Sequence, residues 1–294
     1  MAIVSGRELQ SWRERARARA IAAGIPPEEV DWLLRERGGC STLSLRFAAD
    51  NASIDLNASL SELDRLWQLR IGDRVPLQHL VGRAHWRHFT LKVSPQVLIP
   101  RPETEMLVDL AAAAIAENPA LATGHWVDLG TGSGAIALGL REYLPQGTIH
   151  GVDASPESLA IARENARMLA IAEGINFYQG SWWQPLAALA GKISGMVSNP
   201  PYIPSALIPQ LQPEVCRHEP HLALDGGRDG LDAIRYLVET APDYLHSGGF
   251  WAVEMMDGQA RAVARLLEEQ GQYCQIHIVP DLANVDRFAL AYRQ

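Results

Sequence analysis

The fold is decided by the stretch Val127-Asp128-Leu129-Gly130-Thr131-Gly132-Ser133-Gly134-Ala135-Ile136-Ala137-Leu138. An apolar strand-like segment ends here in a glycine-rich turn, and an apolar helix-like segment begins at once. Glycines in such a turn let the backbone pass close beneath a bound nucleotide. About 20 residues further on, a second strand-like segment ends in Asp153, whose carboxylate is placed to accept hydrogen bonds from ribose hydroxyls. The pattern predicts a nucleotide-type cofactor site.

Strand-like and helix-like segments alternate on both sides of this stretch. Such alternation predicts an α/β fold in which a mainly parallel sheet is covered on both faces by helices. The expected strands span 125–129, 148–153, 175–179, 195–199, 250–254, 275–279 and 288–292, and the expected helices span 135–143, 156–169, 233–245 and 259–270.

The chain before this region has a different character. Ser5 with Glu8 three residues later resembles a capping box, and helical patterns continue through a third helix at 61–69. Phe89, Leu91 and Val93 then alternate as in a strand. We therefore predict a helical domain at 1–75 that docks the substrate, a β-hairpin linker at 76–98 and a catalytic domain at 99–294.

Composition limits the partners of this chain. Of its 294 residues, 47% are apolar and 20% charged, which suits a large buried core. Residues 1–92 carry 14 basic and 11 acidic side chains, whereas 93–294 carry 12 and 23, so the net charge of -8 divides into +3 and -11. An acidic catalytic half argues against a groove that follows a nucleic-acid backbone.

The cellular compartment and the role of the arginine-rich N-terminal segment can also be predicted from the sequence. The N-terminus shows no secretion signal, no apolar run of about 18 residues could span a bilayer, and three scattered cysteines suit a reducing compartment, so we predict a cytoplasmic protein. The arginines at 7, 13, 15, 17 and 19 are interpreted as a solvated helix face paired with Glu8 and Glu14. The alternative is that this basic segment contacts an acidic partner.

The glycine turn leaves the cofactor open between two classes. Gly132, Gly134 and Ala137 also satisfy the dinucleotide pattern G-x-G-x-x-G/A. Asp128 beside the turn suits a positively charged ligand such as a sulfonium better than a pyrophosphate. We therefore favour S-adenosylmethionine over NAD.

Asn199-Pro200-Pro201-Tyr202 follows the fourth strand, at the sheet edge where open α/β folds bind ligands. The Asn199 side-chain oxygen and the Pro200 carbonyl can accept both hydrogens of an NH2 group, because the prolines fix the chain and remove two donors. Tyr202 offers a flat face for a planar amide or base. The alternative is a plain strand break in which Asn199 caps the turn.

These motifs together resemble the PrmC/HemK protein-glutamine N5-methyltransferases, which modify the Gly-Gly-Gln motif of class 1 peptide chain release factors. The resemblance covers nearly the whole chain and includes 98–105, 128–134, 198–203, Glu219-Pro220, Ala223-Leu224 and Asp286-Arg287. It implies a Rossmann-like, seven-stranded class I S-adenosylmethionine-dependent methyltransferase domain. The chain departs from the family at Ala84-His85-Trp86 and at 281–284, which affects hairpin or loop shape.

The resemblance also assigns roles to residues. S-adenosylmethionine is expected to contact Gly130, Thr131, Gly132, Ser133, Gly134, Asp153, Trp182 and Asn199. The glutamine is expected to be held by Asn199, Pro200, Pro201 and Tyr202, of which Asn199, Pro200 and Tyr202 are the catalytic candidates.

Residues 101–105 are expected to line the entrance, with an ordinary helix start as the alternative, and Glu254 is interpreted as structural. The pairs His85/His88 and His218/His221 lack a third ligand nearby in sequence, so no metal is predicted. We expect a monomer with no membrane partner and no nucleic-acid readout. The rival functions are a methyltransferase for adenine or guanine amino groups, a nicotinamide-dependent oxidoreductase and a noncatalytic nucleotide-binding adaptor.

Overall fold

The computed structural model describes residues 2–47, 49 and 51–294. The chain divides into two compact units. The first extends up to Gly82 and also includes Pro213–His218, and the second holds Arg83–Gln212 and Glu219–Gln294. The chain therefore passes from one unit to the other three times.

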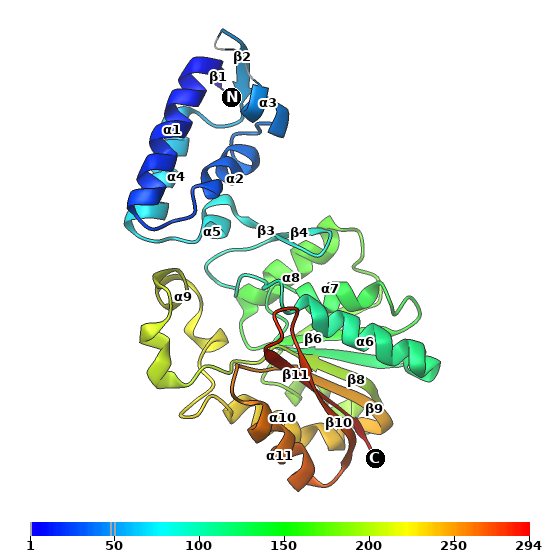
Figure 1. Ribbon diagram of the computed structural model, residues 1–294. Helices are drawn as coiled ribbons and strands as arrows, with labels where there is room; N and C mark the ends of the chain where they lie inside the picture. The colour runs from blue at the N-terminus through cyan, green and yellow to red at the C-terminus, as the bar shows by residue number, and fades with distance from the viewer. Residues whose placement is uncertain (1, 48, 50) are drawn as a thin grey trace. The chain divides into compact units, whose positions relative to one another are not determined.

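The first unit is mainly helical (Figure 1). The capping box predicted at its start is confirmed, since Ser5 Oγ accepts a hydrogen bond from Glu8 N and the Glu8 side chain accepts one from Ser5 N. Strands β1 (Ala2–Ser5) and β2 (Ser53–Leu56) form an antiparallel pair that the sequence did not predict. The helices are α1 (Gly6–Ala22), α2 (Glu28–Glu36), α3 (Thr42–Phe47), α4 (Leu60–Gly72), α5 (Leu77–Val81) and α9 (Pro213–His218).

The arginines of α1 are not paired as the sequence suggested. Arg13 forms an ion pair of 2.6 Å with Asp31 of α2, and Arg19 forms one of 2.8 Å with Asp64 of α4. Glu8 instead caps its own helix, and Glu14 accepts a hydrogen bond from Gln10. For Arg13 and Arg19 the predicted pairing with Glu8 and Glu14 is wrong, because acidic residues of neighbouring helices are better placed for these two cations.

A short hairpin follows, and the second unit begins with it. Strands β3 (Arg83–Trp86) and β4 (Phe89–Lys92) pair antiparallel, in agreement with the alternation read from the sequence. Trp86 and Leu91 are fully buried among the side chains of the second unit.

The second unit is built on a seven-stranded sheet of order β10-β11-β9-β8-β5-β6-β7 (Figure 1). Its strands are β5 (His125–Leu129), β6 (Thr148–Asp153), β7 (Ile175–Gln179), β8 (Ile193–Ser198), β9 (Leu245–Glu254), β10 (Tyr273–Pro280) and β11 (Asp286–Arg293). The neighbouring pairs from β9 to β7 are parallel, whereas β11 is antiparallel to both β9 and β10. The predicted α/β fold class is confirmed.

Helices cover both faces of this sheet because successive strand side chains point to opposite sides. Trp126 and Phe250 belong to the core under α6 (Glu105–Glu117), α7 (Ala135–Arg141) and α8 (Pro156–Met168). Val127 and Trp251 belong to the core under α10 (Asp232–Thr240) and α11 (Ala260–Gln270). Short 3-10 helices span Pro119–Thr123, Gln184–Leu189, Ser205–Gln210, His221–Ala223 and Ala241–Asp243.

Among the described helices, none combines the length and the apolar character that crossing a bilayer requires.

Candidate active site

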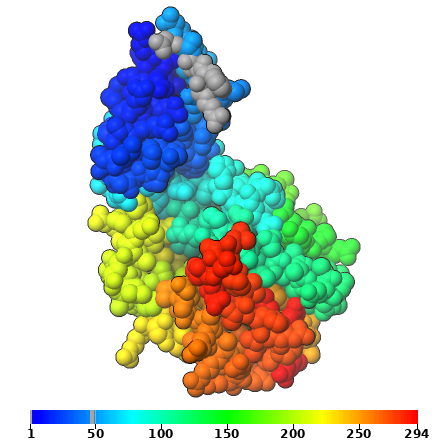
Figure 2. Space-filling model, viewed as in Figure 1, coloured from blue at the N-terminus to red at the C-terminus, as the bar shows by residue number. Residues whose placement is uncertain are grey.

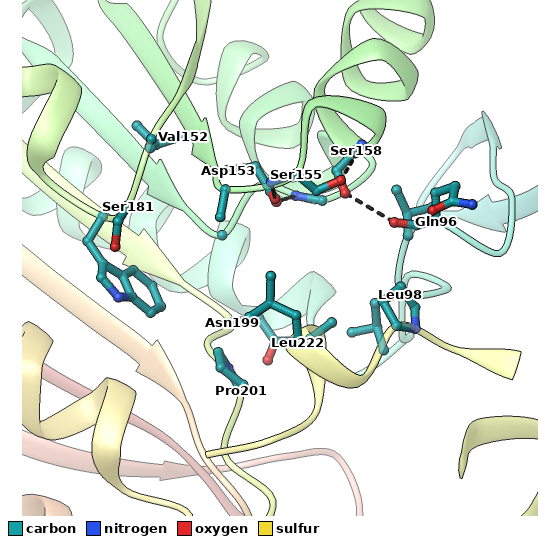
Figure 3. A pocket seen from close by; sticks show the side chains of 18 residues that line it. Gln96, Leu98, Val152, Asp153, Ser155, Ser158, Ser181, Asn199, Pro201 and Leu222 are labelled. Atoms are coloured by element: carbon teal, nitrogen blue, oxygen red, sulfur yellow. Dashed lines mark hydrogen bonds between the residues drawn. The ribbon is translucent and has the colours of Figure 1, made fainter. Parts of the chain in front are cut away.

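The candidate site is a cavity of about 270 Å³ in the second unit, at the carboxyl ends of the parallel strands. The strand order reverses here, because β6 continues on one side of β5 whereas β8 lies on the other. Ligands of open α/β sheets bind at such a switch point. Asp153 and Ser155 lie on one side of the cavity, and Asn199, Pro201 and Leu222 lie opposite them (Figure 3).

The glycine turn forms part of the cavity wall. Gly130 and Gly132 line the cavity and have positive φ values of 77° and 55°. A Cβ atom would meet nothing nearer than Asn199 O at 3.9 Å for Gly130 and Gly130 O at 4.0 Å for Gly132. These two glycines therefore leave open space beside the backbone, as close approach of a ligand requires.

Gly134 has a different role. Its φ is 85°, and a Cβ there would lie 3.1 Å from the Ala162 Cβ of α8. It allows the close packing of the turn against a helix. Thr131 and Ser133 are buried, and like Gly134 they do not line the cavity. Of the turn residues predicted to contact the cofactor, only Gly130 and Gly132 lie on its wall.

Asp128 lies behind the turn and is fully buried. Its Oδ2 atom accepts hydrogen bonds from Thr131 Oγ1 at 2.5 Å and from Ala137 N at 3.0 Å. Burial raises the pKa of this carboxyl to about 7, and these two hydrogen bonds oppose the rise. Asp128 thus fixes the turn to α7 and lies behind the residues that line the cavity, and its attraction of a cationic ligand stays a prediction.

Asp153 does line the cavity. Its Oδ2 accepts a hydrogen bond of 2.8 Å from Gly132 N, and its Oδ1 accepts one of 2.9 Å from Ser155 N. Burial raises the pKa of the carboxyl, while these backbone donors lower it. Each carboxylate oxygen has more than one lone pair, so both can still accept hydrogen bonds from a diol.

Trp182 lines the cavity beside Gly180 and Ser181. Its φ of 50° is rare for a bulky residue, and such strained backbone gathers at ligand sites. The adjacent Trp183 is buried and stacks on Tyr244 with ring centroids 4.4 Å apart. Of these two neighbouring tryptophans, Trp182 therefore lines the cavity and Trp183 belongs to the core.

The tetrapeptide after β8 presents Asn199 and Pro201 to the cavity. The Asn199 Nδ2 atom donates to Thr104 Oγ1 at 3.0 Å. Pro200 is buried, and Tyr202 is turned so that its hydroxyl donates to Glu254 Oε1 at 2.8 Å. Burial and the Glu254 charge raise the pKa of Tyr202, so this phenol stays neutral and cannot act as a base.

Known proteins of several organisms are similar to this chain in sequence. A family described as a methyltransferase domain matches residues 122–219. The release factor glutamine methyltransferase of Synechocystis sp. is 49% identical over 98% of this chain and 97% of that protein. The protein of the same name from Thermosynechococcus vestitus is 45% identical over 98% and 99%.

The chain belongs to the release factor glutamine methyltransferase family.

The fold extends to more distant methyltransferase structures. The hMettl16 catalytic domain in complex with the MAT2A 3'UTR hairpin 6 superposes with a TM-score of 0.55 over 84% of this chain and 86% of that chain. The sequence identity is 12%, so this likeness concerns the fold alone.

The cavity wall does not include residues 101–105, and their expected place at the entrance stays a prediction. Gln96, Val97 and Leu98 line the cavity instead. Arg101 is paired with Glu219, and Thr104 stands at the N-terminal cap of α6, so the alternative of a helix start agrees with the structure.

Other residues of the wall were missed by sequence reasoning. Ser155 and Ser158 belong to the start of α8, directly after Asp153, so their position in the sequence could have indicated them. Leu222 lines the wall although its side chain is 67% exposed, and no periodic pattern marks it. Among the described residues, no group of three or more His, Cys, Asp or Glu is placed to hold a metal.

Proposed function

We propose that this chain transfers a methyl group from S-adenosylmethionine to the side-chain amide nitrogen, N5, of the glutamine in the Gly-Gly-Gln motif of class 1 peptide chain release factors. One observation carries the proposal: Gly130, Gly132 and Asp153 line the same cavity as Asn199, and Asp153 and Asn199 lie on opposite sides of it (Figure 3). Relatives of nearly the same length carry the corresponding name.

The residues present fit the cofactor. Gly130 and Gly132 leave space for a ligand beside the backbone, Asp153 can accept from ribose hydroxyls, and Trp182 supplies an aromatic wall. S-adenosylmethionine supplies a methyl group on a positively charged sulfur. With Asp128 buried behind the turn, Asp153 is the carboxylate that meets the cofactor.

Orientation is the main contribution of the acceptor half. An amide nitrogen is a poor nucleophile because its lone pair is delocalised. The Asn199 Oδ1 atom and the Pro200 carbonyl accept the two hydrogens of the substrate NH2 group and hold its nitrogen in line for attack. Well-oriented groups gain roughly 7 to 11 kcal/mol in such reactions. The surplus proton on the methylated nitrogen is released to water after methyl transfer, so the scheme requires no side-chain base.

The test is transfer of labelled methyl from S-adenosylmethionine to purified release factor, compared with the factor whose Gly-Gly-Gln glutamine is changed to alanine. We expect label only in the unchanged factor, and mass mapping should locate it on that side chain. Label on both factors, or none on either, would contradict the proposed substrate.

Within this scheme Asn199→Ala should retain cofactor binding and lose about 100- to 1,000-fold in kcat, as observed when one oriented polar group is removed from an active site. Calorimetry with S-adenosylmethionine checks the first part and the methyl-transfer assay the second. Full activity in this variant would refute the role given to Asn199.

We further infer that the first unit docks the release factor, and that the protein acts in the cytoplasm as a monomer. The +3 balance of residues 1–92 comes from Arg83, Arg87 and Lys92 of the hairpin, which belongs to the second unit, so the docking role is supported instead by three exposed apolar side chains of the first unit. Ile3, Ile21 and Leu43 are 73%, 68% and 70% exposed.

A further inference from the structure

A chain of hydrogen bonds connects the Asn199 carboxamide to a buried carboxylate. Asn199 Nδ2 donates to Thr104 Oγ1 at 3.0 Å, and Thr104 Oγ1 donates to Glu254 Oε2 at 2.6 Å. Tyr202 OH donates to the other oxygen, Glu254 Oε1, at 2.8 Å. Thr104 is 5% exposed and Glu254 is 1% exposed, so water does not compete for these bonds.

Three elements of the second unit converge to make this chain of bonds. Thr104 directly precedes α6, Glu254 ends β9, and Asn199 directly follows β8. Strands β8 and β9 are parallel neighbours, so their carboxyl ends lie at the same edge of the sheet. The fold thus brings Thr104 and Glu254 beneath the side chain that faces the substrate.

We propose that Glu254, acting through Thr104, fixes which end of the Asn199 carboxamide faces the substrate. An ionised carboxylate only accepts hydrogen bonds, so the single hydroxyl hydrogen of Thr104 is committed to Glu254. The Thr104 oxygen can then only accept, and Asn199 must turn its NH2 group toward it. The Asn199 oxygen is left free for the cavity.

The consequence concerns catalysis directly, and it rests on the proposed function. A substrate carboxamide needs an acceptor at this position, because both of its nitrogen hydrogens must be held. If the Asn199 carboxamide were flipped, its own NH2 group would face the substrate NH2 group. Both groups only donate, so they would repel each other. Thr104 and Glu254 are therefore positioning residues.

The same logic predicts a dependence on pH. A protonated Glu254 can donate to Thr104, whose hydroxyl is then free to donate to Asn199 and to permit the flipped amide. Burial raises the pKa of Glu254, whereas Thr104, Tyr202 and Arg287 of β11 lower it and Glu103 raises it. Activity should therefore be full where Glu254 is ionised and should fall as the pH drops through its raised pKa.

Thr104→Val and Thr104→Ser test the proposal on the full-length chain. The valine variant keeps the side-chain shape but removes the acceptor, and we expect kcat to fall about 10- to 100-fold, as expected for a misplaced active-site group. The Michaelis constant for S-adenosylmethionine should stay within about twofold. The serine variant restores the hydroxyl and should recover most of the lost kcat. Thr148→Val, at the amino end of β6, is the matched control for the change itself.

A double-mutant cycle adds a readout that loss of stability would not produce. In an Asn199→Ala background, Thr104→Val should reduce kcat no further, because the group that it positions is gone. If the fold-losses in kcat of the two single variants multiplied in the double variant, this result would overturn the proposal. So would a valine variant with the kcat of the unchanged protein.

Glu254→Gln cannot ionise, so the acid decline of kcat should disappear in this variant. An acid decline that persists unchanged would overturn the proposal. If the unchanged protein methylates no release factor, the proposed function itself fails. If it does so while Thr104→Val remains fully active, only the positioning role fails.

Discussion

Asp128 and Asp153 are two carboxylates at the ends of adjacent strands with opposite tasks. Asp128 is fully buried and holds the glycine turn to α7 through Thr131 and Ala137. Asp153 binds Gly132 and Ser155 and keeps lone pairs for the cavity. Both side chains accept two short hydrogen bonds from the protein, so hydrogen bonding does not distinguish them. They differ in burial, because Asp128 is fully buried whereas Asp153 lines the cavity.

The raised pKa of Asp128 predicts a distinct pH dependence of stability. Its pKa moves from 3.8 to about 7 in the folded protein, so at intermediate pH the folded form holds a proton that the unfolded form has lost. The free energy of unfolding should therefore fall as the pH rises from 4 to 7. Between pH 5 and pH 8 this contribution is about 2 to 3 kcal/mol.

Asp128→Asn removes this titration and keeps an oxygen for Thr131 and Ala137. Urea unfolding at pH 5 and pH 8 measures the free energy of unfolding of both proteins. Between these pH values it should fall by about 2 to 3 kcal/mol less in the variant than in the unchanged protein. Asp153, Glu219 and Glu254 titrate in both proteins, so their contributions cancel. An equal fall in the free energy of unfolding of both proteins would contradict the raised pKa of Asp128.

The segment 225–231 packs against the tetrapeptide Asn199–Tyr202 and the residue after it. Ile203 and Asp225 form a parallel bridge, and Gln259 Nε2 donates to the Tyr202 carbonyl at 3.0 Å. Gly226 and Gly230 allow the two backbones to approach closely, since a Cβ on either would lie under 3.0 Å from a carbonyl oxygen of Pro201 or Tyr202.

Gly230→Ala should therefore disturb the tetrapeptide. Its φ is 77°, and the new Cβ would meet Tyr202 O. Gly248→Ala is the matched control, with a φ of 78° and no atom within 4 Å. We expect a cost of about 1 to 2 kcal/mol for the control from backbone strain, and about 1 to 3 kcal/mol more for Gly230→Ala from crowding.

Denaturant unfolding measures both costs, and the methyl-transfer assay shows whether Gly230→Ala also loses kcat while Gly248→Ala does not. Equal unfolding free energies and equal kcat values in the two variants would show that this loop does not support the tetrapeptide.

Sequence periodicity located the strands of the sheet well and the supporting contacts poorly. The bounds of β5, β6 and β7 agree with those predicted, because each strand begins directly after a glycine, at Gly124, Gly147 and Gly174. The pair β1 and β2 was missed because each strand has only four residues and its partner lies about fifty positions away.

The same limit explains the site. Gly130, Gly132, Asp153 and Asn199 follow strand ends and could be assigned to one edge of the sheet in advance. The partnership of Asn199 with Thr104 joins residues 95 positions apart through side chains, and no local pattern encodes it. Whether Asp128 faces a ligand or the core also depends on packing that a strand-end position does not reveal.

The docking role of the first unit can be tested without removing any part of the chain. A charge can be placed at three exposed apolar positions by the substitutions Ile3→Asp, Ile21→Asp and Leu43→Asp. The surface of α1 is dark blue in Figure 2. At least one should raise the Michaelis constant for the whole release factor about fivefold, which corresponds to the ~1 kcal/mol of an interface contact.

A short peptide containing Gly-Gly-Gln should show no such change, because it reaches only the cavity. Met168→Asp, at the end of α8 in the second unit, is the control for an added charge at an exposed apolar position. Unchanged constants for the whole factor in all three variants would contradict the docking role.

The membership of α9 in the first unit has a further consequence. Arg70 is buried and binds Glu29 of α2 and Glu214 of α9, while Arg74 also reaches Glu214 at 2.7 Å. A gene shortened to start at residue 83 would strip Glu214 of both arginines. A transplant of the first unit between relatives should therefore carry residues 213–218 along with it, so that Glu214 keeps Arg70 and Arg74.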